Sequence, residues 1–148
     1  MSGRVCGLAR RAATRAPMEL VEETTITVEA GVDGDARGRL RGRQVTVLCQ
    51  ESWDAACRDL GRDVPWTTRR ANILIEGLDL ANSAGKTLAI GEATLAITGE
   101  TDPCQRMDEQ AQGLTAALAP GWRGGVTCRV IEAGAVKVGD GVKFALSA

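Results

Sequence analysis

The sequence predicts a mainly β fold: a small closed or partly open β-barrel of mostly antiparallel strands, with two helices at its rim. Short runs of β-branched residues alternate with turns rich in glycine and aspartate, and they outnumber the helical segments. A turn of glycine and an acid occurs at Gly91-Glu92 and again at Gly139-Asp140, as expected where a closed sheet bends. A chain of 148 residues is long enough for one domain, residues 1–148, with its own core.

In the first half of the chain, strands are predicted around Gly3 to Leu8, from Leu20 to Val28 and from Gln44 to Cys49. Apolar residues then recur at i, i+3, i+4 and i+7 between Glu51 and Leu60, and Gly61 follows as a stop signal. This last segment is therefore predicted to be an amphipathic helix.

In the second half, an apolar strand is predicted after Asn72, two strands are predicted within Thr87 to Thr98, and another spans Val126 to Ile131.

The second helix is predicted to begin at Pro103 and to continue through Leu118. Gly113 weakens this helix, and Pro120-Gly121 ends it.

The composition excludes several functional classes. A net charge of −1 gives no general attraction to nucleic acid or to a membrane surface. No stretch approaches the roughly 20 apolar residues of a membrane span, and Met1 to Leu20 lacks the apolar core of a secretion signal, so a cytoplasmic location is expected. The chain has no histidine, which removes Ser-His-Asp and Cys-His catalysis and imidazole-based zinc sites. Its chemistry must use cysteine, carboxylates, arginine or a bound cofactor.

The chain has five cysteines, an odd number without the paired spacing of a disulfide framework, which indicates a reducing compartment. Cys6, Cys49, Cys57 and Cys128 have β-branched or apolar neighbours and are predicted to be inert core residues. Cys104 stands apart from them because of the residues around it.

Cys104 lies where the second helix is predicted to begin. Asp102 is a predicted N-cap, Pro103 suits the first helical position, and Gln105 can complete a capping box. The unpaired N–H groups of that turn, together with Arg106, favour a thiolate at Cys104. A thiolate is a nucleophile, a metal ligand or a sulfur carrier. The alternative is a small apolar residue packed under a turn.

Two groups of arginines could face an anion. Arg37, Arg39, Arg41 and Arg43 recur every second residue, which suits either a solvated edge or an anion-facing rim. Arg69-Arg70-Ala71-Asn72 precedes an apolar strand. Such a loop could hold a phosphate or a pterin by charge-assisted hydrogen bonds, or could simply expose surface arginines.

Several motifs together resemble MOSC domains, a family named for the C-terminal domain of molybdenum cofactor sulfurase. The resemblance runs from about Gly3 to Phe144, as expected for a free-standing MOSC domain. Its motifs, in chain order, are Gly34-Asp35, Arg70-Ala71-Asn72, Leu88-x-Ile-Gly-x-Ala-x-Leu95, Pro103-Cys104-x-Arg106, Arg123-Gly124-Gly125-Val126 and Gly134-x-Val-x-Val-Gly139-Asp140-x-Val142.

The resemblance implies a barrel related to the pyruvate kinase barrel domain, with Cys104 as its reactive centre and no need for pyridoxal phosphate. Some relatives are molybdenum-dependent oxidoreductases that reduce N-hydroxylated substrates, and there the cysteine ligates molybdenum held by a pterin. In others the cysteine is thought to carry sulfur for metal-sulfur assembly. An electron donor or sulfur donor protein would therefore be an external partner.

The same resemblance implies a site composition. Cys104 is the expected catalytic residue and metal ligand, and the expected residues of the molybdenum-pterin site are Arg70, Asn72, Arg106, Arg123 and Asp35. One motif departs from the family. Many members have Gly-Asp-x-His or Gly-Asp-Arg where this chain has Gly34-Asp35-Ala36-Arg37, so the role of Arg37 does not transfer.

Overall fold

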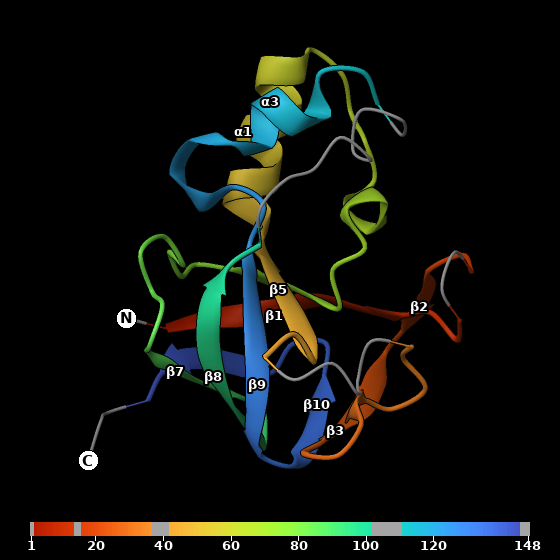
Figure 1. The fold of residues 1–148 in the computed structure, drawn as a ribbon, viewed down its shortest axis with the longest axis vertical. Helices are drawn as coiled ribbons and strands as arrows, with labels where there is room; N and C mark the ends of the chain where they lie inside the picture. The colour runs from red at the N-terminus through yellow and green to blue at the C-terminus, as the bar shows by residue number, and fades with distance from the viewer. Residues whose placement is uncertain (1, 14–15, 37–41, 102–110, 146–148) are drawn as a thin grey trace.

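A computed structural model describes residues 2–13, 16–36, 42–101 and 111–145. Eight of its strands form one sheet, in the order β11-β7-β8-β9-β5-β6-β1-β2, and a further pairing of β11 with β1 closes all of them except β2 into a barrel (Figure 1). These strands are β1 (Ser2–Arg10), β2 (Glu19–Val21), β5 (Val45–Cys49), β6 (Ile73–Glu76), β7 (Thr87–Ile90), β8 (Ala93–Glu100), β9 (Val126–Glu132) and β11 (Gly141–Phe144).

The pairings are antiparallel except between β5 and β6, where Val47 lies opposite Ile73 in a parallel register. The predicted barrel of mostly antiparallel strands is therefore confirmed. The chain between these two parallel strands forms the helix α1 (Gln50–Leu60) and the short 3-10 helix η1 (Trp66–Arg69), because a parallel connection must cross from one end of the sheet to the other.

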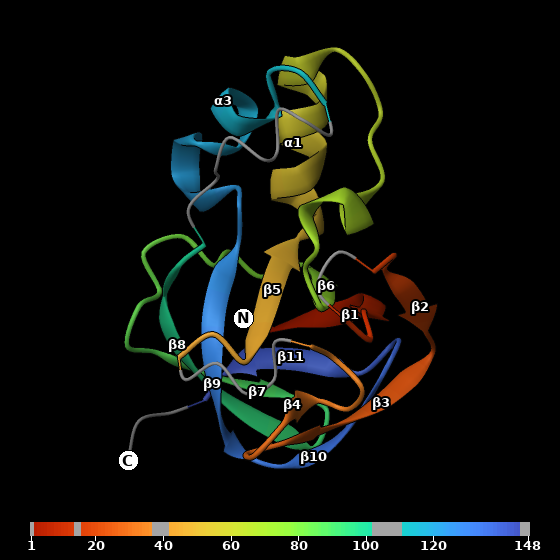
Figure 2. The ribbon, with the colours of Figure 1, turned by 45° about the vertical axis from the view of Figure 1, so that its right-hand side comes forward.

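A second sheet of three strands has the order β10-β3-β4, from β10 (Gly134–Lys137), β3 (Glu23–Thr27) and β4 (Gly31–Val32). Ile26, Val32 and Val136 of this sheet are buried in the same core as the barrel strands. Figure 2 places the small sheet at the end of the barrel opposite the helices. It therefore closes that end of the core.

The predicted strand from Leu20 to Val28 is two strands with a break at Glu22. β2 pairs with β1 in the barrel, whereas β3 pairs with β10 in the small sheet. The chain changes sheets at this residue, and the Glu22 carbonyl accepts a hydrogen bond from Val138 N–H, at 2.9 Å. Tertiary pairing, which local propensity does not report, causes the break.

The predicted turns at Gly91-Glu92 and Gly139-Asp140 meet in space. Gly91 N–H donates to the Gly141 carbonyl at 3.1 Å, and a Cβ on Gly91 would lie 2.5 Å from Asp140 Oδ2. Gly91 also has φ +54°, so a side chain would be strained there as well as obstructed. The corner needs glycine for both reasons.

The two predicted helices are α1 and α3 (Leu114–Leu118), and they lie together at one end of the barrel (Figure 1). α1 buries Trp53, Ala56 and Cys57 in a second core that includes Leu114 and Leu118. Gly61 ends α1 in the left-handed conformation, φ +79°, as its position after the apolar repeat predicts. Among the described residues, no helix is long and apolar enough to cross a membrane.

The prediction of one helix continuing through Gly113 is wrong. Gly113 has φ +88° and is the N-cap of α3, so α3 begins at Leu114. The predicted helix start at Pro103 lies outside the described residues. Glycine has no Cβ, so it is a poor helix former and adopts positive φ without steric cost. The chain can therefore turn at this point.

Candidate functional site

The described part of the candidate site is built around residues 69–72, which connect η1 to β6. Arg69 is buried, with 8% of its surface exposed. Its Nε donates to the Gly124 carbonyl at 3.1 Å and its Nη2 donates to the Thr101 carbonyl at 2.9 Å. Arg69 therefore joins the residue that follows β8 to the loop that precedes β9.

Asn72 is also buried, with 2% of its surface exposed. Its Oδ1 accepts a hydrogen bond from Thr46 N–H at 3.1 Å, and its Nδ2 donates to the Ala9 carbonyl at 3.2 Å. Its own N–H donates to Thr46, and its carbonyl accepts from Ala9 N–H at 2.8 Å. These bonds tie β1 to β5 and use both polar groups of the side chain.

Arg70 lies between these two anchored residues and differs from both. Its backbone has φ +64° and ψ +29°, a left-handed conformation that residues other than glycine seldom adopt. Its N–H donates to the Thr67 carbonyl at 2.9 Å. Arg70 is half-buried as a residue. Within the described ranges its guanidinium makes no hydrogen bond or ion pair, so its donors are available to an anion.

Arg123 contacts both helices. Its Nη1 lies 2.5 Å from Asp59 Oδ2 on α1 and donates to the Ala117 carbonyl on α3 at 3.0 Å. These contacts fasten α1 to α3. Arg123 is linked to residues 69–72 through its neighbour Gly124, which accepts from Arg69.

Asp35 lies near the end of β1. Its Oδ1 accepts a hydrogen bond from Arg11 N–H at 3.0 Å, and Ala9, two residues before Arg11, contacts Asn72. Asp35 thus connects its loop to the strand that Asn72 holds, while its expected role at a cofactor stays a prediction.

Cys104 and Arg106 lie outside the described residues, as do Asp102, Arg37, Arg39 and Arg41. The residues that flank the cysteine segment, which we define as residues 102–110, are described. Thr101 N–H donates to the Gly125 carbonyl at 2.9 Å, and Ala111 is buried in the second core against the helices. The described residue before the segment, Thr101, therefore contacts Arg69, and the described residue after it, Ala111, packs at the helical end of the barrel.

The cysteines within the described ranges do not resemble reactive thiols. Burial raises the pKa of Cys49 and of Cys128 to about 12, and Cys57 is also buried. In the residues that the structure covers, no cluster of three or more histidine, cysteine, aspartate or glutamate side chains could hold a metal ion.

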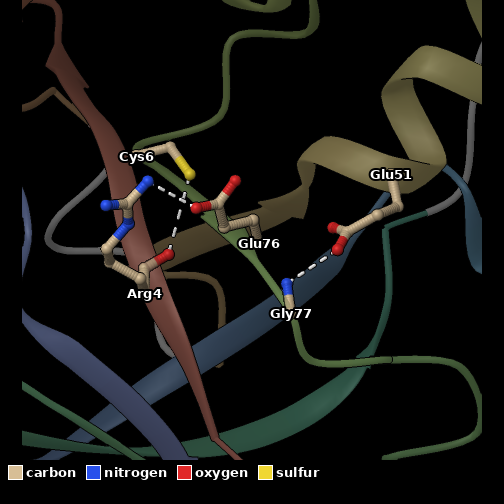
Figure 3. Close-up of polar contacts among 5 residues, drawn as sticks. All are labelled: Arg4, Cys6, Glu51, Glu76 and Gly77. Atoms are coloured by element: carbon tan, nitrogen blue, oxygen red, sulfur yellow. Dashed lines mark hydrogen bonds and ion pairs between the residues drawn. The ribbon is translucent and has the colours of Figure 1, made fainter.

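Cys6 was predicted to lie in the core but is only partly buried. Figure 3 shows its Sγ directed at the Arg4 carbonyl, 3.7 Å away, while Arg4 Nη2 pairs with Glu76 Oε1 at 2.6 Å. Burial raises the pKa of the Cys6 thiol, and the neighbouring Glu76 carboxylate raises it further. Cys6 is thus an accessible thiol in an environment that disfavours its thiolate.

Glu51, drawn in the same view, lies in the first turn of α1 and accepts a hydrogen bond from Gly77 N–H at 2.7 Å. This contact connects the start of α1 to the residue that follows β6, and Asn72 directly precedes the same strand. Both α1 and residues 69–72 are therefore attached to β6.

Sequence reasoning missed the role of Arg69. Two adjacent arginines in a loop have the same composition and local propensity, so the pattern does not indicate which one turns inward. A partial signal was present in Gly124-Gly125, because a glycine pair before a strand is typical of a close backbone approach. The structure places Arg69 and Thr101 at this approach.

The MOSC domain pattern matches residues 27–143, and this chain belongs to the MOSC domain family, which is associated with the molybdenum cofactor. Similar solved structures include the YuaD protein from Bacillus subtilis, with a TM-score of 0.78 and 21% identity over 96% of this chain and 94% of that chain. YiiM from Escherichia coli has a TM-score of 0.73 and 18% identity over 98% of this chain and 71% of that chain. YiiM from Geobacillus stearothermophilus has a TM-score of 0.70 and 15% identity, over 97% and 73% of the two chains.

At these identities the structural likeness establishes the fold. No curated protein sequence matches this chain.

Proposed function

We propose that this domain binds a molybdenum-pterin cofactor, with the Cys104 thiolate as a ligand to the metal, and reduces N-hydroxylated substrates with electrons from a separate donor protein. Membership of the MOSC family supports the cofactor class. The observation that supports the proposal most directly in this chain is that the Arg70 guanidinium has no partner among the described residues, while its backbone is left-handed.

Arg70 fits an anionic group on three counts. The residue is half-buried, and its guanidinium makes no hydrogen bond or ion pair with the described residues. Its neighbours Arg69 and Asn72 are both anchored by buried hydrogen bonds, so the loop is held in place before any ligand arrives. Its left-handed backbone is a strained conformation, and such conformations cluster at binding and catalytic sites.

In this proposal the residues have separate roles. Arg70 donates charge-assisted hydrogen bonds to the phosphate or the pterin, for which a planar guanidinium is suited. Asn72 acts by holding the strand ends beneath Arg70, because both of its polar groups are engaged. Cys104, aided by Arg106, presents a thiolate. When bound, the cofactor supplies the redox chemistry.

The test is the molybdenum content of protein made in cells that produce the cofactor, measured by mass spectrometry for the wild type and for Cys104→Ser. We expect bound molybdenum in the wild type and a large loss in the variant. Cys6→Ser is the matched control, because Cys6 is only partly buried and its thiol has a raised pKa. Equal molybdenum in wild type and Cys104→Ser would remove the ligand role.

A second candidate function is a sulfur or cofactor carrier, in which Cys104 holds a persulfide. The absence of histidine, the commonest general acid and base, fits a carrier at least as well as an enzyme. Incubation with a cysteine desulfurase should then add one sulfur at Cys104, seen in the intact mass. Bound molybdenum without such an adduct would count against the sulfur carrier.

A third candidate is a barrel that only binds a protein partner. It requires that Cys104→Ala change neither the metal content, nor the adduct, nor any activity.

A further inference from the structure

We infer that Arg69 is a positioning residue that fixes the backbone at Thr101, where the cysteine segment begins, and so sets how Cys104 is presented. The inference rests on the proposed function in one respect, since it takes Cys104 to be the reactive residue. The contacts that carry it all lie within the described ranges.

The geometry of Arg69 is that of a clamp between two loops. Its guanidinium donates through two different nitrogens to the carbonyls of Gly124 and Thr101, which lie 55 and 32 residues away in the sequence. Both bonds are made by a charged donor in a buried location, where such hydrogen bonds are stronger than in water. A rigid, planar fork can satisfy two diverging acceptors at once, which the single ammonium of lysine cannot do with the same geometry.

The clamp leaves Thr101 little freedom. Its carbonyl is held by Arg69, while its N–H donates to the Gly125 carbonyl at 2.9 Å. Both backbone polar groups of the residue that precedes Asp102 are thus bonded. These two bonds fix the backbone orientation of Thr101.

The opposing loop is shaped to allow this approach. A Cβ on Gly124 would lie 2.6 Å from the Thr101 carbonyl oxygen and 3.1 Å from Arg69 Nη2. A Cβ on Gly125 would lie 2.3 Å from the Val47 carbonyl oxygen, and Gly125 has φ +88°. The glycine pair therefore brings β9 close enough to Thr101 for Arg69 to bridge the two.

Arg70 supplies an internal comparison, because it is the next residue and has the same side chain. The Arg69 side chain donates to protein carbonyls, whereas the Arg70 side chain has no partner among the described residues. The left-handed turn at Arg70 separates the two directions. Removing Arg69 should therefore disturb Thr101, whereas removing Arg70 should not.

The experiment compares Arg69→Met, Arg69→Lys and Arg70→Met with the wild type. The first readout is hydrogen exchange at the Thr101 amide. The second is the pH profile of iodoacetamide labelling at Cys104, with Cys6 as the reference thiol. We expect Arg69→Met to speed Thr101 exchange by roughly tenfold or more, the effect of losing a charge-assisted hydrogen bond. We also expect the pH profile of Cys104 labelling to shift in Arg69→Met. In Arg69→Lys, both readouts should lie between those of Arg69→Met and the wild type.

Arg70→Met should leave Thr101 exchange at the wild-type rate. Arg129→Met, a change on the exposed face of β9, should leave both readouts unchanged. If Arg69→Met does not fold, Arg69→Lys provides the same comparison. Wild-type Thr101 exchange in a folded Arg69 variant would overturn the inference. Faster exchange with an unmoved Cys104 profile would also overturn it, because Arg69 would then be structural only.

If Cys104 is not the reactive residue that the proposed function requires, the result is different. Wild-type Cys104 would then label no faster than Cys6 at neutral pH, whatever happens in the Arg69 variants. If wild-type Cys104 is reactive but its labelling pH profile is unchanged in the Arg69 variants, only the positioning role of Arg69 is overturned.

Discussion

Arg70 combines two properties that oppose each other in a purely structural residue. Its left-handed backbone costs roughly 1–2 kcal/mol relative to the right-handed region, and a glycine would avoid most of that cost. Its guanidinium makes no hydrogen bond or ion pair within the described part of the chain that would offset this cost. A strained residue without a structural contact is typical of a site where the side chain serves a ligand.

Arg70→Gly should therefore separate stability from function. Relief of the left-handed strain, partly offset by the greater unfolded-state freedom of glycine, should raise the free energy of unfolding by up to about 1 kcal/mol. Cofactor retention should fall because the anion loses its guanidinium. Chemical denaturation and molybdenum analysis of the same preparation measure the two effects. A stable variant that keeps all its molybdenum would contradict the proposed role of Arg70.

At Cys104 the prediction concerns the thiol itself. A cysteine in the first turn of a helix capped by Asp102, with Arg106 nearby, should have a pKa well below the ordinary value, in the range of about 3.5–7.5. Iodoacetamide labelling across pH, analysed by peptide mass spectrometry, should modify Cys104 first at neutral pH. The raised pKa values of Cys6, Cys49 and Cys128 predict slow labelling of those thiols. If Cys104 labels no faster than they do, it is a packed residue and no reactive centre exists there.

Among the elements, β1 and β5 depend on Asn72, which bonds to both although it lies just before β6. Asn72→Ala should leave Thr46 N–H and the Ala9 carbonyl without their buried partners. Each such loss costs about 1–3 kcal/mol, so we expect the two together to lower the free energy of unfolding by about 2–6 kcal/mol. Thr46→Val is the matched control, because it keeps the N–H bond and removes only the hydroxyl contacts; it should cost about 1 kcal/mol. Urea unfolding gives both values, and an equal loss in the two variants would contradict this assignment.

The elements that the sequence predicts well are those determined by local pattern. α1 needs only apolar residues at helical spacing and Gly61 to end it, and all of these are visible in the sequence. The break at Glu22 and the turn at Gly113 depend instead on which neighbour the chain meets next. The same limit applies at the site. Cys104 and Arg70 belong to recognisable motifs, whereas the inward direction of Arg69 arises from the left-handed turn after it and from the space that Gly124 leaves.

At the scale of the whole molecule, the barrel closes through contacts that tolerate little added volume. β1 meets β11 on one side and β6 on the other, and a Cβ on Gly3 would lie 2.2 Å from the Glu76 carbonyl oxygen. The recurring turns of glycine and acid predicted a closed sheet, but they did not indicate which strands meet. Closure places one continuous core inside the barrel and the second core under the helices, and the candidate site lies where the chain passes between them.

The barrel core also predicts how stability depends on pH. Cys49 and Cys128 are held neutral by burial, with pKa values of about 12 against an ordinary value of 9.0. Above about pH 9 the unfolded chain therefore releases protons that the native protein keeps, so stability is complete below that pH and falls as pH rises toward 12. Each thiol should contribute a loss of about 1.4 kcal/mol per pH unit in this range.

Cys128→Val isolates this effect, because valine has a similar volume and no proton to lose. The chain has no tyrosine to titrate in the same window, and its three tryptophans report unfolding by fluorescence. Urea unfolding at about pH 8 and about pH 10 should show a smaller alkaline loss in the variant than in the wild type, by about 1.4 kcal/mol for the thiol removed over the pH unit above 9. An identical loss in the two proteins would mean that the Cys128 thiol does not stay neutral in the folded barrel.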